Sequence, residues 1–152
     1  MLKVILKLLV VLFGNIKIMN NFKNKTIVIN CDFDGTVVTH EYPFIGKDIG
    51  AVPVLHKMIA SGCNLILFTM RSGKTLDDAI KWFENNNIEL YGIQTNPKQK
   101  TWTTSPKSLA DLMIDDSALG CPLKIDTSLS NRPFVDWVAV EKLLIEKGII
   151  NE

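Results

Sequence analysis

Two kinds of hydrophobic pattern alternate along the chain from Lys25 onward. The first is a short run of apolar, often β-branched residues bounded by polar or glycine positions, which is typical of a buried strand. The second places apolar residues three and four positions apart, which is typical of an amphipathic helix. The first pattern predicts strands at residues 26–30, 64–70, 88–95 and 109–114. The second predicts helices at residues 51–62, 75–86 and 136–148.

Capping and turn residues mark the ends of these helices. Gly62 and Gly148 follow apolar stripes, and glycine is the residue that most often ends a helix. Thr75 and Asp78 form a T-x-x-D capping box, which predicts that the second helix begins at Thr75.

The order of the predicted elements indicates the fold class. Strands that alternate with helices predict an α/β fold with right-handed crossovers, here a Rossmann-like three-layer sandwich with a mainly parallel sheet. A length of 152 residues suits a single domain. We expect this domain to span residues 25–152.

Acidic and polar residues lie at the ends of three of the predicted strands. Because ligands bind at the carboxyl ends of parallel strands, we expect these side chains to gather at one edge of the sheet. They are Asp32, Asp34, Thr69, Arg71, Asp115 and Asp116. Carboxylates gathered in this way repel one another unless a cation lies among them, and hard oxygen ligands suit Mg²⁺. The alternative is structural, since Asp-Gly is common in turns and Asp-Asp can cap a helix.

The N-terminal residues 1–24 form an apolar extension that is interrupted by lysines. Its longest uncharged stretch, residues 8–16, is far shorter than the ~20 residues that span a bilayer, so we expect no transmembrane span. No small-residue cleavage site follows it. Three interpretations stay open: an amphipathic anchor, a signal-like segment, or an upstream extension with Met19 as the true start. We favour the last, because a compact domain can begin cleanly at "NNFKNKTIVIN".

Charge and cysteine content narrow the class of protein. Seventeen basic and sixteen acidic side chains leave a net charge of +1, which gives no strong signal for nucleic-acid binding. The three cysteines are widely spaced, and no two of them form a C-x-x-C pair. This spacing argues against a zinc site or a disulfide framework. We therefore expect a cytoplasmic protein.

Three segments together resemble a known family. They are "DFDGT", "LILFTMR" and "DLMIDD", and they resemble the motifs of the haloacid dehalogenase (HAD) superfamily of phosphotransferases. The likeness covers residues 27–116 and is greatest with the small phage- and bacterial-type hydrolases. Any one segment alone is a weak signal, whereas the combination is specific.

The resemblance implies roles for the acidic residues. Asp32 would attack phosphorus and form an aspartyl-phosphate. Asp34 would protonate the leaving oxygen, then activate the hydrolytic water, and would offer its backbone carbonyl to the metal. Thr69 would hydrogen-bond the phosphoryl group. Asp116 would join Asp32 as a Mg²⁺ ligand, with Asp115 beside it or acting through water.

The resemblance also implies a lysine and further contacts with the substrate. Lys107 is the best match for the lysine that holds the phosphate, although a straight strand of six residues would put it about 20 Å from the Asp115 end. Lys98 or Lys100 would reach more easily. Arg71 would clamp the substrate or serve as a salt-bridge partner. Other substrate contacts are expected from Gly35, from the backbone of Met70 and from His40.

The spacing of the motifs leaves no room for a cap domain. Only 14 residues separate Thr36 from Ala51, enough for a hairpin flap, and the loop at 96–108 is too short to fold by itself. We therefore expect a capless enzyme whose open site accepts large substrates or borrows a lid from a second subunit. Tyr42 and Phe44 of the flap and Trp102 of the later loop would contact the leaving group or only seal the core.

These observations predict a Mg²⁺-dependent phosphomonoester hydrolase with a phosphorylated substrate whose identity the sequence does not reveal. One alternative is a phosphatase of nucleotides or polynucleotide ends, which a basic groove would favour. That groove would contain Lys98, Lys100, Lys107 and Arg71. The other alternative is a catalytically idle HAD-like binding protein, which has no chemical reason to keep the acidic residues.

Overall fold

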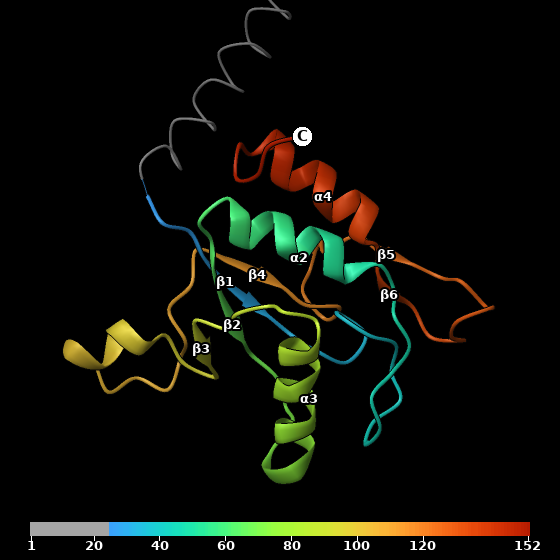
Figure 1. Ribbon diagram of the computed structural model, residues 1–152, viewed down its shortest axis with the longest axis horizontal. Coiled ribbons are helices and arrows are strands. Elements are labelled where there is room, and N and C mark those ends of the chain that lie inside the picture. Colours follow the sequence, from blue (N-terminus) through green and yellow to red (C-terminus); the bar gives the residue numbers. More distant parts are fainter. Residues whose placement is uncertain (1–24) are drawn as a thin grey trace, which may run out of the picture.

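The computed structural model describes residues 25–152. Its centre is a four-stranded parallel sheet with the strand order β3-β2-β1-β4 (Figure 1). The strands are β1 (Val28–Cys31), β2 (Asn64–Leu67), β3 (Gly92–Ile93) and β4 (Leu112–Ile114). The helices are α2 (Ala51–Ala60), α3 (Gly73–Asn85) and α4 (Trp137–Glu146). The predicted α/β fold with a parallel sheet is confirmed.

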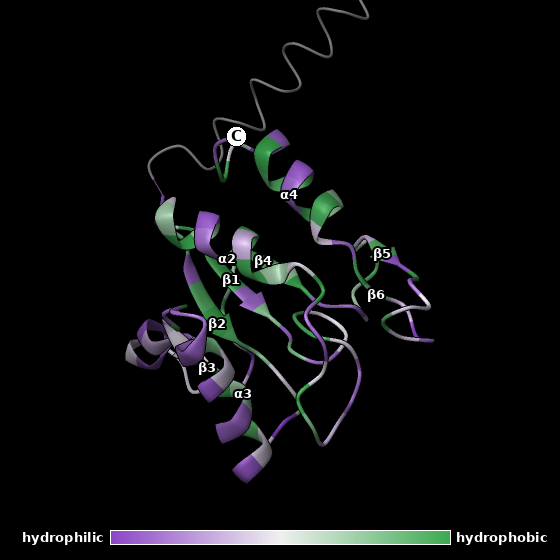
Figure 2. Ribbon diagram, turned by 45° about the vertical axis from the view of Figure 1, so that its right-hand side comes forward, coloured by the Kyte–Doolittle hydropathy of each residue, from purple (hydrophilic) through white to green (hydrophobic). Residues whose placement is uncertain are grey.

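The core lies between the helices and one face of the sheet. Side chains alternate along a strand, so Ile29, Cys31, Leu65 and Leu67 point to the same face. They form one buried cluster with residues of all three helices, including Phe83. Figure 2 shows β2 as mostly hydrophobic and α3 as mostly hydrophilic, as expected for a central strand and a surface helix.

The opposite face of the sheet is covered by the segment 96–110. Asn30, on this face of β1, donates to the Ser108 carbonyl at 3.5 Å and accepts from the Ser108 hydroxyl at 3.0 Å. The segment contains a 3-10 helix, η1 (Pro97–Thr101), and the buried Gln99 side chain holds it together through Ser105, Lys107 and Leu109. The sheet therefore lies between two layers, in a Rossmann-like arrangement.

Several element bounds differ from the prediction. The observed strands β2 and β3 are shorter than the strands predicted at 64–70 and 88–95. The reason is that the chain leaves the sheet to form loops at its carboxyl edge. Residues 109–111 likewise precede β4. The helices predicted at 51–62 and 136–148 end earlier, at Ala60 and Glu146.

The predicted start of α3 is also wrong. Ser72 is the N-cap, with an extended backbone, and Thr75 is the third residue of the helix. The Thr75 hydroxyl donates to the Ser72 carbonyl at 2.8 Å, and the Ser72 N–H donates to the Thr75 hydroxyl at 3.4 Å. Asp78 instead pairs with Lys74 one turn earlier. The capping box predicted from Thr75 and Asp78 therefore begins three residues earlier, at Ser72.

Residues 36–50 and 96–110 hold no cap domain. The flap contains only isolated bridges from Val38 to Asp34 and Asp48, and the later segment contains only η1. A two-stranded hairpin of β5 (Leu123–Lys124) and β6 (Phe134–Val135) precedes α4, and the sequence pattern did not predict it. None of the helices in residues 25–152 is long and apolar enough to cross a bilayer. The interpretations offered for residues 1–24 lie outside the described residues.

Candidate active site

The register of the sheet brings three loops to one edge. Cys31, at the end of β1, is level with Leu67 of β2 and Ile114 of β4. The residues that follow these positions line a cavity of about 230 Å³. Its lining is Asp32, Asp34, His40, Thr69, Met70, Asp115, Asp116 and Ser117. The predicted convergence of acidic side chains from separate strands is therefore observed.

Three carboxylates form a compact cluster in this cavity. Asp32, Asp115 and Asp116 each offer an oxygen atom, and these atoms lie within 4.8 Å of one another. Burial raises the pKa of Asp32 to about 7, opposed in part by a hydrogen bond from the Phe33 backbone, and the charges of Asp115 and Asp116 raise it further. A set of hard oxygen donors with uncompensated negative charge fits Mg²⁺. Asp32, Asp115 and Asp116 would hold the ion.

Thr36 joins two of these carboxylates. Its hydroxyl accepts a hydrogen bond from the Asp116 backbone N–H at 3.0 Å and donates to Oδ2 of Asp32 at 3.1 Å. Its side chain is fully buried. The Thr36 carbonyl accepts from the indole N–H of Trp137 at 2.7 Å, which ties the loop to the start of α4. Sequence reasoning gave neither residue a role. The hydroxyl in D-x-D-G-T was a usable signal for Thr36, whereas no local pattern indicates Trp137.

This arrangement predicts the effect of replacing Thr36 by valine. The change keeps the shape but removes the hydroxyl, so the Asp116 N–H loses its acceptor and Asp32 loses a donor. We expect Mg²⁺ affinity to fall about 10- to 100-fold, which is the usual loss when a group that hydrogen-bonds to a metal ligand is removed. Titration calorimetry with Mg²⁺ measures this. Thr36→Ser is the matched control, since it keeps the hydroxyl, and equal Mg²⁺ affinity in both variants would contradict the assignment.

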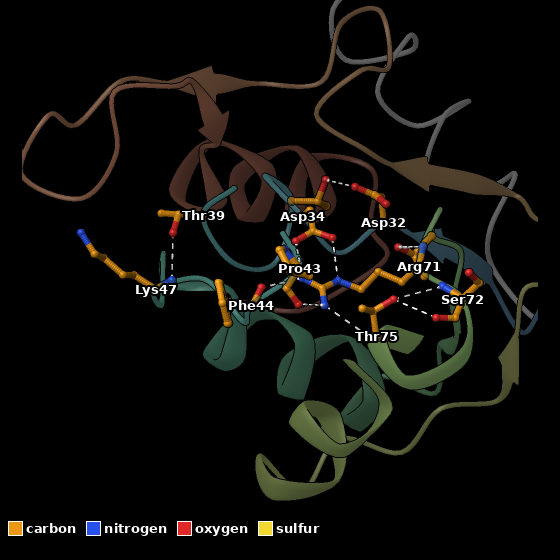
Figure 3. Close-up of polar contacts among 11 residues, drawn as sticks. Asp32, Asp34, Thr39, Pro43, Phe44, Lys47, Arg71, Ser72 and Thr75 are labelled. Carbon is orange, nitrogen blue, oxygen red and sulfur yellow. Dashed lines mark hydrogen bonds and ion pairs between the residues drawn. The ribbon is translucent and has the colours of Figure 1, made fainter. Parts of the chain in front are cut away.

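Arg71 is buried and faces Asp34 rather than open solvent. Its exposed fraction is 2%, and its Nε and one terminal nitrogen each donate to a different oxygen of Asp34 at 2.7 Å (Figure 3). The remaining donors bond to the carbonyls of Pro43, Phe44 and Thr75 at 2.7 to 3.3 Å. Of the two roles predicted for Arg71, the salt-bridge partner is the one observed. The physical reason is that every guanidinium direction already has an acceptor.

Gly35 lies against His40, which lines the cavity. Gly35 has a φ of +78°, and a β-carbon there would lie 2.0 Å from the His40 Nε2 atom. The same His40 nitrogen lies 3.0 Å from Oδ2 of Asp116. Glycine is thus required for the close approach of the imidazole. Both residues support the acidic cluster, which differs from the direct substrate contact that the resemblance implies.

The loop after β2 is held by Gln94. Its side-chain oxygen accepts from the Thr69 N–H at 3.0 Å, and its side-chain nitrogen donates to the Thr69 carbonyl. The Thr69 hydroxyl accepts from the Arg71 N–H at 3.3 Å. Met70 is almost fully exposed at the mouth of the cavity. Thr69 therefore lines the same cavity as the acidic cluster, and Gln94 holds its backbone in place.

Comparison with known proteins identifies one relative by structure. A conserved protein from Bacteroides thetaiotaomicron is 34% identical in sequence and superposes with a TM-score of 0.66. The match covers 81% of this chain and 93% of the Bacteroides chain. The chain belongs to the family of this conserved protein. No protein-family model matches the chain, and no curated protein matches it. The name of the Bacteroides protein states no activity, so the chemistry of this family member has to be argued from its site.

The three candidate lysines lie away from the acidic cavity in this family member. No lysine of residues 25–152 lines it. Lys107 is exposed and lines a different cavity of about 440 Å³ beside Trp102. Lys98 and Lys100 are exposed residues of η1. The reason is that the segment 96–110 covers the opposite face of the sheet, so it does not reach the carboxyl edge.

The aromatic residues expected near the leaving group are exposed and lie outside the cavity lining. Tyr42 is 65% exposed and Phe44 is 75% exposed in the flap. Trp102 is 67% exposed in the later loop. None of the three seals the core. Tyr42 instead lies over the Arg71 guanidinium, with its ring centre 5.4 Å from the guanidinium carbon.

Proposed function

We propose that this protein is a Mg²⁺-dependent phosphomonoester hydrolase of the HAD type that works through an aspartyl-phosphate on Asp32. The observation that carries the proposal is the cluster of Asp32, Asp115 and Asp116 at the carboxyl edge of a parallel sheet, with Thr69 beside it. One carboxylate would serve as nucleophile and the others as metal ligands. A parallel sheet with its ligand site at the carboxyl edge is suited to this arrangement.

Each residue of the cavity has a defined part in this proposal. Asp32 supplies the attacking oxygen, and Thr36 keeps that carboxylate oriented through its hydroxyl. The Thr69 hydroxyl binds an oxygen of the phosphoryl group. A bound Mg²⁺ would neutralise negative charge on the phosphoryl oxygens. Asp34 is the group that handles protons during the cycle.

Hydrolysis of p-nitrophenyl phosphate tests the proposal. The wild-type protein should release p-nitrophenol when Mg²⁺ is present, and EDTA should remove the activity. Ca²⁺ is an informative control, because it prefers longer bonds and more ligands than Mg²⁺ and should support less activity. Absence of hydrolysis above background with Mg²⁺, for aryl and acyl phosphates alike, would overturn the enzyme proposal and favour the idle binding protein.

The phosphatase of nucleotides or polynucleotide ends has no specific support. Its expected basic groove required Lys98, Lys100, Lys107 and Arg71. The lysines do not line the acidic cavity, and Arg71 is buried against Asp34. We therefore propose no substrate of that class.

The raised pKa of Asp32 predicts how the stability of the metal-free protein depends on pH. Its folded-state value of about 7 lies above its ordinary value of 3.8, so the folded protein holds the proton more tightly than the unfolded chain. The free energy of unfolding should therefore fall as pH rises from about 4 to about 7, by on the order of 4 kcal/mol from this group. Chemical denaturation in EDTA across this range measures the effect.

Two comparisons sharpen this measurement. Asp32→Asn should remove most of the decrease, because the amide does not ionise. Mg²⁺ should raise the melting temperature more at pH 8 than at pH 5, because the ion binds the ionised carboxylates. An equal decrease in wild type and Asp32→Asn would show that another group causes it.

A further inference from the structure

The segment 96–110 carries a local positive charge that the near-neutral charge of the whole chain conceals. It contains no acidic residue, and its basic residues are Lys98, Lys100 and Lys107. All three are exposed, and none of them forms an ion pair within residues 25–152. Asp111, the next acidic residue along the chain, pairs with Lys25. The segment therefore presents uncompensated positive charge, which attracts an anionic partner.

Trp102 presents an open indole ring next to this charge. It caps the C-terminal end of η1, the 3-10 helix that carries Lys98 and Lys100, and Figure 1 shows this segment in yellow beside β3. Its exposed fraction is 67%, and no aromatic or cation–π pair of residues 25–152 involves it. Trp102 and Lys107 line the same cavity of about 440 Å³. The ring is therefore a platform on which a planar group can stack.

Two hydroxyl groups of the same cavity have protons available for a ligand. The Thr103 hydroxyl accepts from the Ser105 N–H at 3.1 Å, and the Ser105 hydroxyl accepts from the Lys107 N–H at 3.2 Å. Neither hydroxyl donates to an acceptor within residues 25–152, although each can donate as well as accept. Lysine and hydroxyl donors together are the groups that proteins use to bind the phosphates of nucleic acids.

The cavity is built on a backbone that buried amide groups hold in place. The Gln99 side chain is buried, donates to the carbonyls of Ser105 and Lys107 at 3.0 Å each, and accepts from the Leu109 N–H at 2.8 Å. The Asn96 side chain donates to the Leu109 carbonyl at 3.0 Å. Because the segment is already ordered, little conformational entropy is lost when a ligand binds to it.

We propose that one surface of this segment binds single-stranded nucleic acid. This basic surface consists of Lys98, Lys100, Trp102, Thr103, Ser105 and Lys107. One base stacks on the indole ring, and the lysines and hydroxyls contact the neighbouring phosphates. A single strand fits better than a duplex, because only an unpaired base offers its face to the ring. An acidic peptide would use the charge but not the ring.

This proposal goes beyond the proposed function and does not depend on it. The basic surface lies away from the cavity that contains Asp32, so the bound strand is a partner and not the substrate. Loss of one activity therefore leaves the other intact.

Fluorescence anisotropy with two labelled ten-nucleotide strands, oligothymidylate and oligouridylate, tests the proposal on the full chain. We expect a Kd of about 10⁻⁴ to 10⁻⁶ M for at least one strand and weaker binding to a duplex of equal length. Three phosphate contacts predict that affinity falls about 20-fold between about 50 and 200 mM salt. Failure of both strands to bind at low salt, or equal binding of the duplex, would overturn the proposal.

Two variants locate the binding on the basic surface. Trp102→Ala should weaken binding at least about fivefold through the loss of one stacked base, with little change in the salt dependence. Replacement of Lys98, Lys100 and Lys107 by glutamine should remove most of the salt dependence. All four positions are exposed, so the melting temperature should stay near the wild-type value. Wild-type affinity in both folded variants would contradict the proposal.

Matched controls and a rival ligand complete the experiment. Phe44→Ala and the pair Lys81→Gln and Lys142→Gln change equally exposed residues elsewhere and should bind as the wild type does. A similar loss of affinity in these controls would count against the basic surface. Sedimentation with phosphatidylserine vesicles tests a membrane as the partner. Binding to vesicles without binding to either strand would assign the surface to an anionic membrane and overturn the proposal.

Discussion

Replacement of Asp32 by asparagine is expected to lower the rate of p-nitrophenyl phosphate hydrolysis by at least about 10³-fold, because the amide is not a nucleophile and no other group can form the covalent intermediate. Among the three clustered carboxylates, Asp32 is the one that directly follows the central strand β1 and accepts a hydrogen bond from the Thr36 hydroxyl. Steady-state kinetics at saturating Mg²⁺ measures the change. The loss should appear in kcat, since Thr69 still binds the phosphoryl group.

Two controls separate chemistry from folding in this experiment. Asp32→Asn should melt no lower than the wild type at pH 8 in EDTA, because it removes a charge that repels Asp115 and Asp116. Asp77→Asn changes an exposed carboxylate on the outside of α3 and should leave the rate unchanged. Activity in Asp32→Asn within tenfold of wild type would mean that Asp32 is not the nucleophile.

Replacement of Asp34 by asparagine should separate the two chemical steps. With p-nitrophenyl phosphate the first step needs no proton from Asp34, so p-nitrophenol should appear in a rapid burst equal to the enzyme concentration. Turnover should then be slower than in the wild type by about 10²- to 10⁴-fold, because the hydrolytic water has lost its proton acceptor. Rapid-quench or stopped-flow kinetics with Mg²⁺ resolves the burst from the slow phase.

The integrity of Asp34→Asn has to be measured alongside its kinetics. The asparagine oxygen still accepts from Arg71, but its NH₂ group replaces the second acceptor next to a buried cation. A lower melting temperature is therefore expected. Mg²⁺ affinity should stay near the wild-type value, since Asp34 is not one of the clustered carboxylates. Loss of the burst in a folded, Mg²⁺-binding variant would mean that the first step also needs Asp34.

The sequence was most informative where the geometry of a parallel sheet determines position. Asp32, Asp115 and Thr69 were expected at one edge because they follow apolar runs, and the register of β1, β2 and β4 brings them there. Spacing alone is sufficient in this case, because the carboxyl ends of parallel strands coincide. No comparison with a related chain was needed to find the acidic cluster.

Roles that depend on tertiary contacts were not predictable from local patterns. Arg71 lies 37 residues from Asp34 in the sequence, and nothing near either residue indicates a bidentate pair. Lys107 matched a family pattern, but its segment covers the opposite face of the sheet through the contact of Ser108 with Asn30. Trp137 supports Thr36 from 101 residues away. Each placement is decided by packing across the whole domain.

Element ends were predicted less well for a related reason. The Thr75 hydroxyl had been assigned to the N-cap, yet it bonds back to Ser72, and both residues have side chains able to cap a helix. The choice depends on where the chain leaves β2, and Arg71 fixes that path by its bonds to Asp34 and to the Thr75 carbonyl. The strands β5 and β6 have two residues each, too few for a periodic signal.

Mapping of a covalent phosphoenzyme is the most direct test of the central claim. Asp34→Asn protein is mixed with p-nitrophenyl phosphate and Mg²⁺, quenched in acid during the burst, and digested for mass spectrometry. We expect one phosphoryl group on the peptide that contains Asp32. Reduction with borohydride should convert Asp32, and no other aspartate, to homoserine. Burst kinetics with the phosphoryl group on another residue, or turnover in the wild type with no covalent adduct in either protein, would contradict the account.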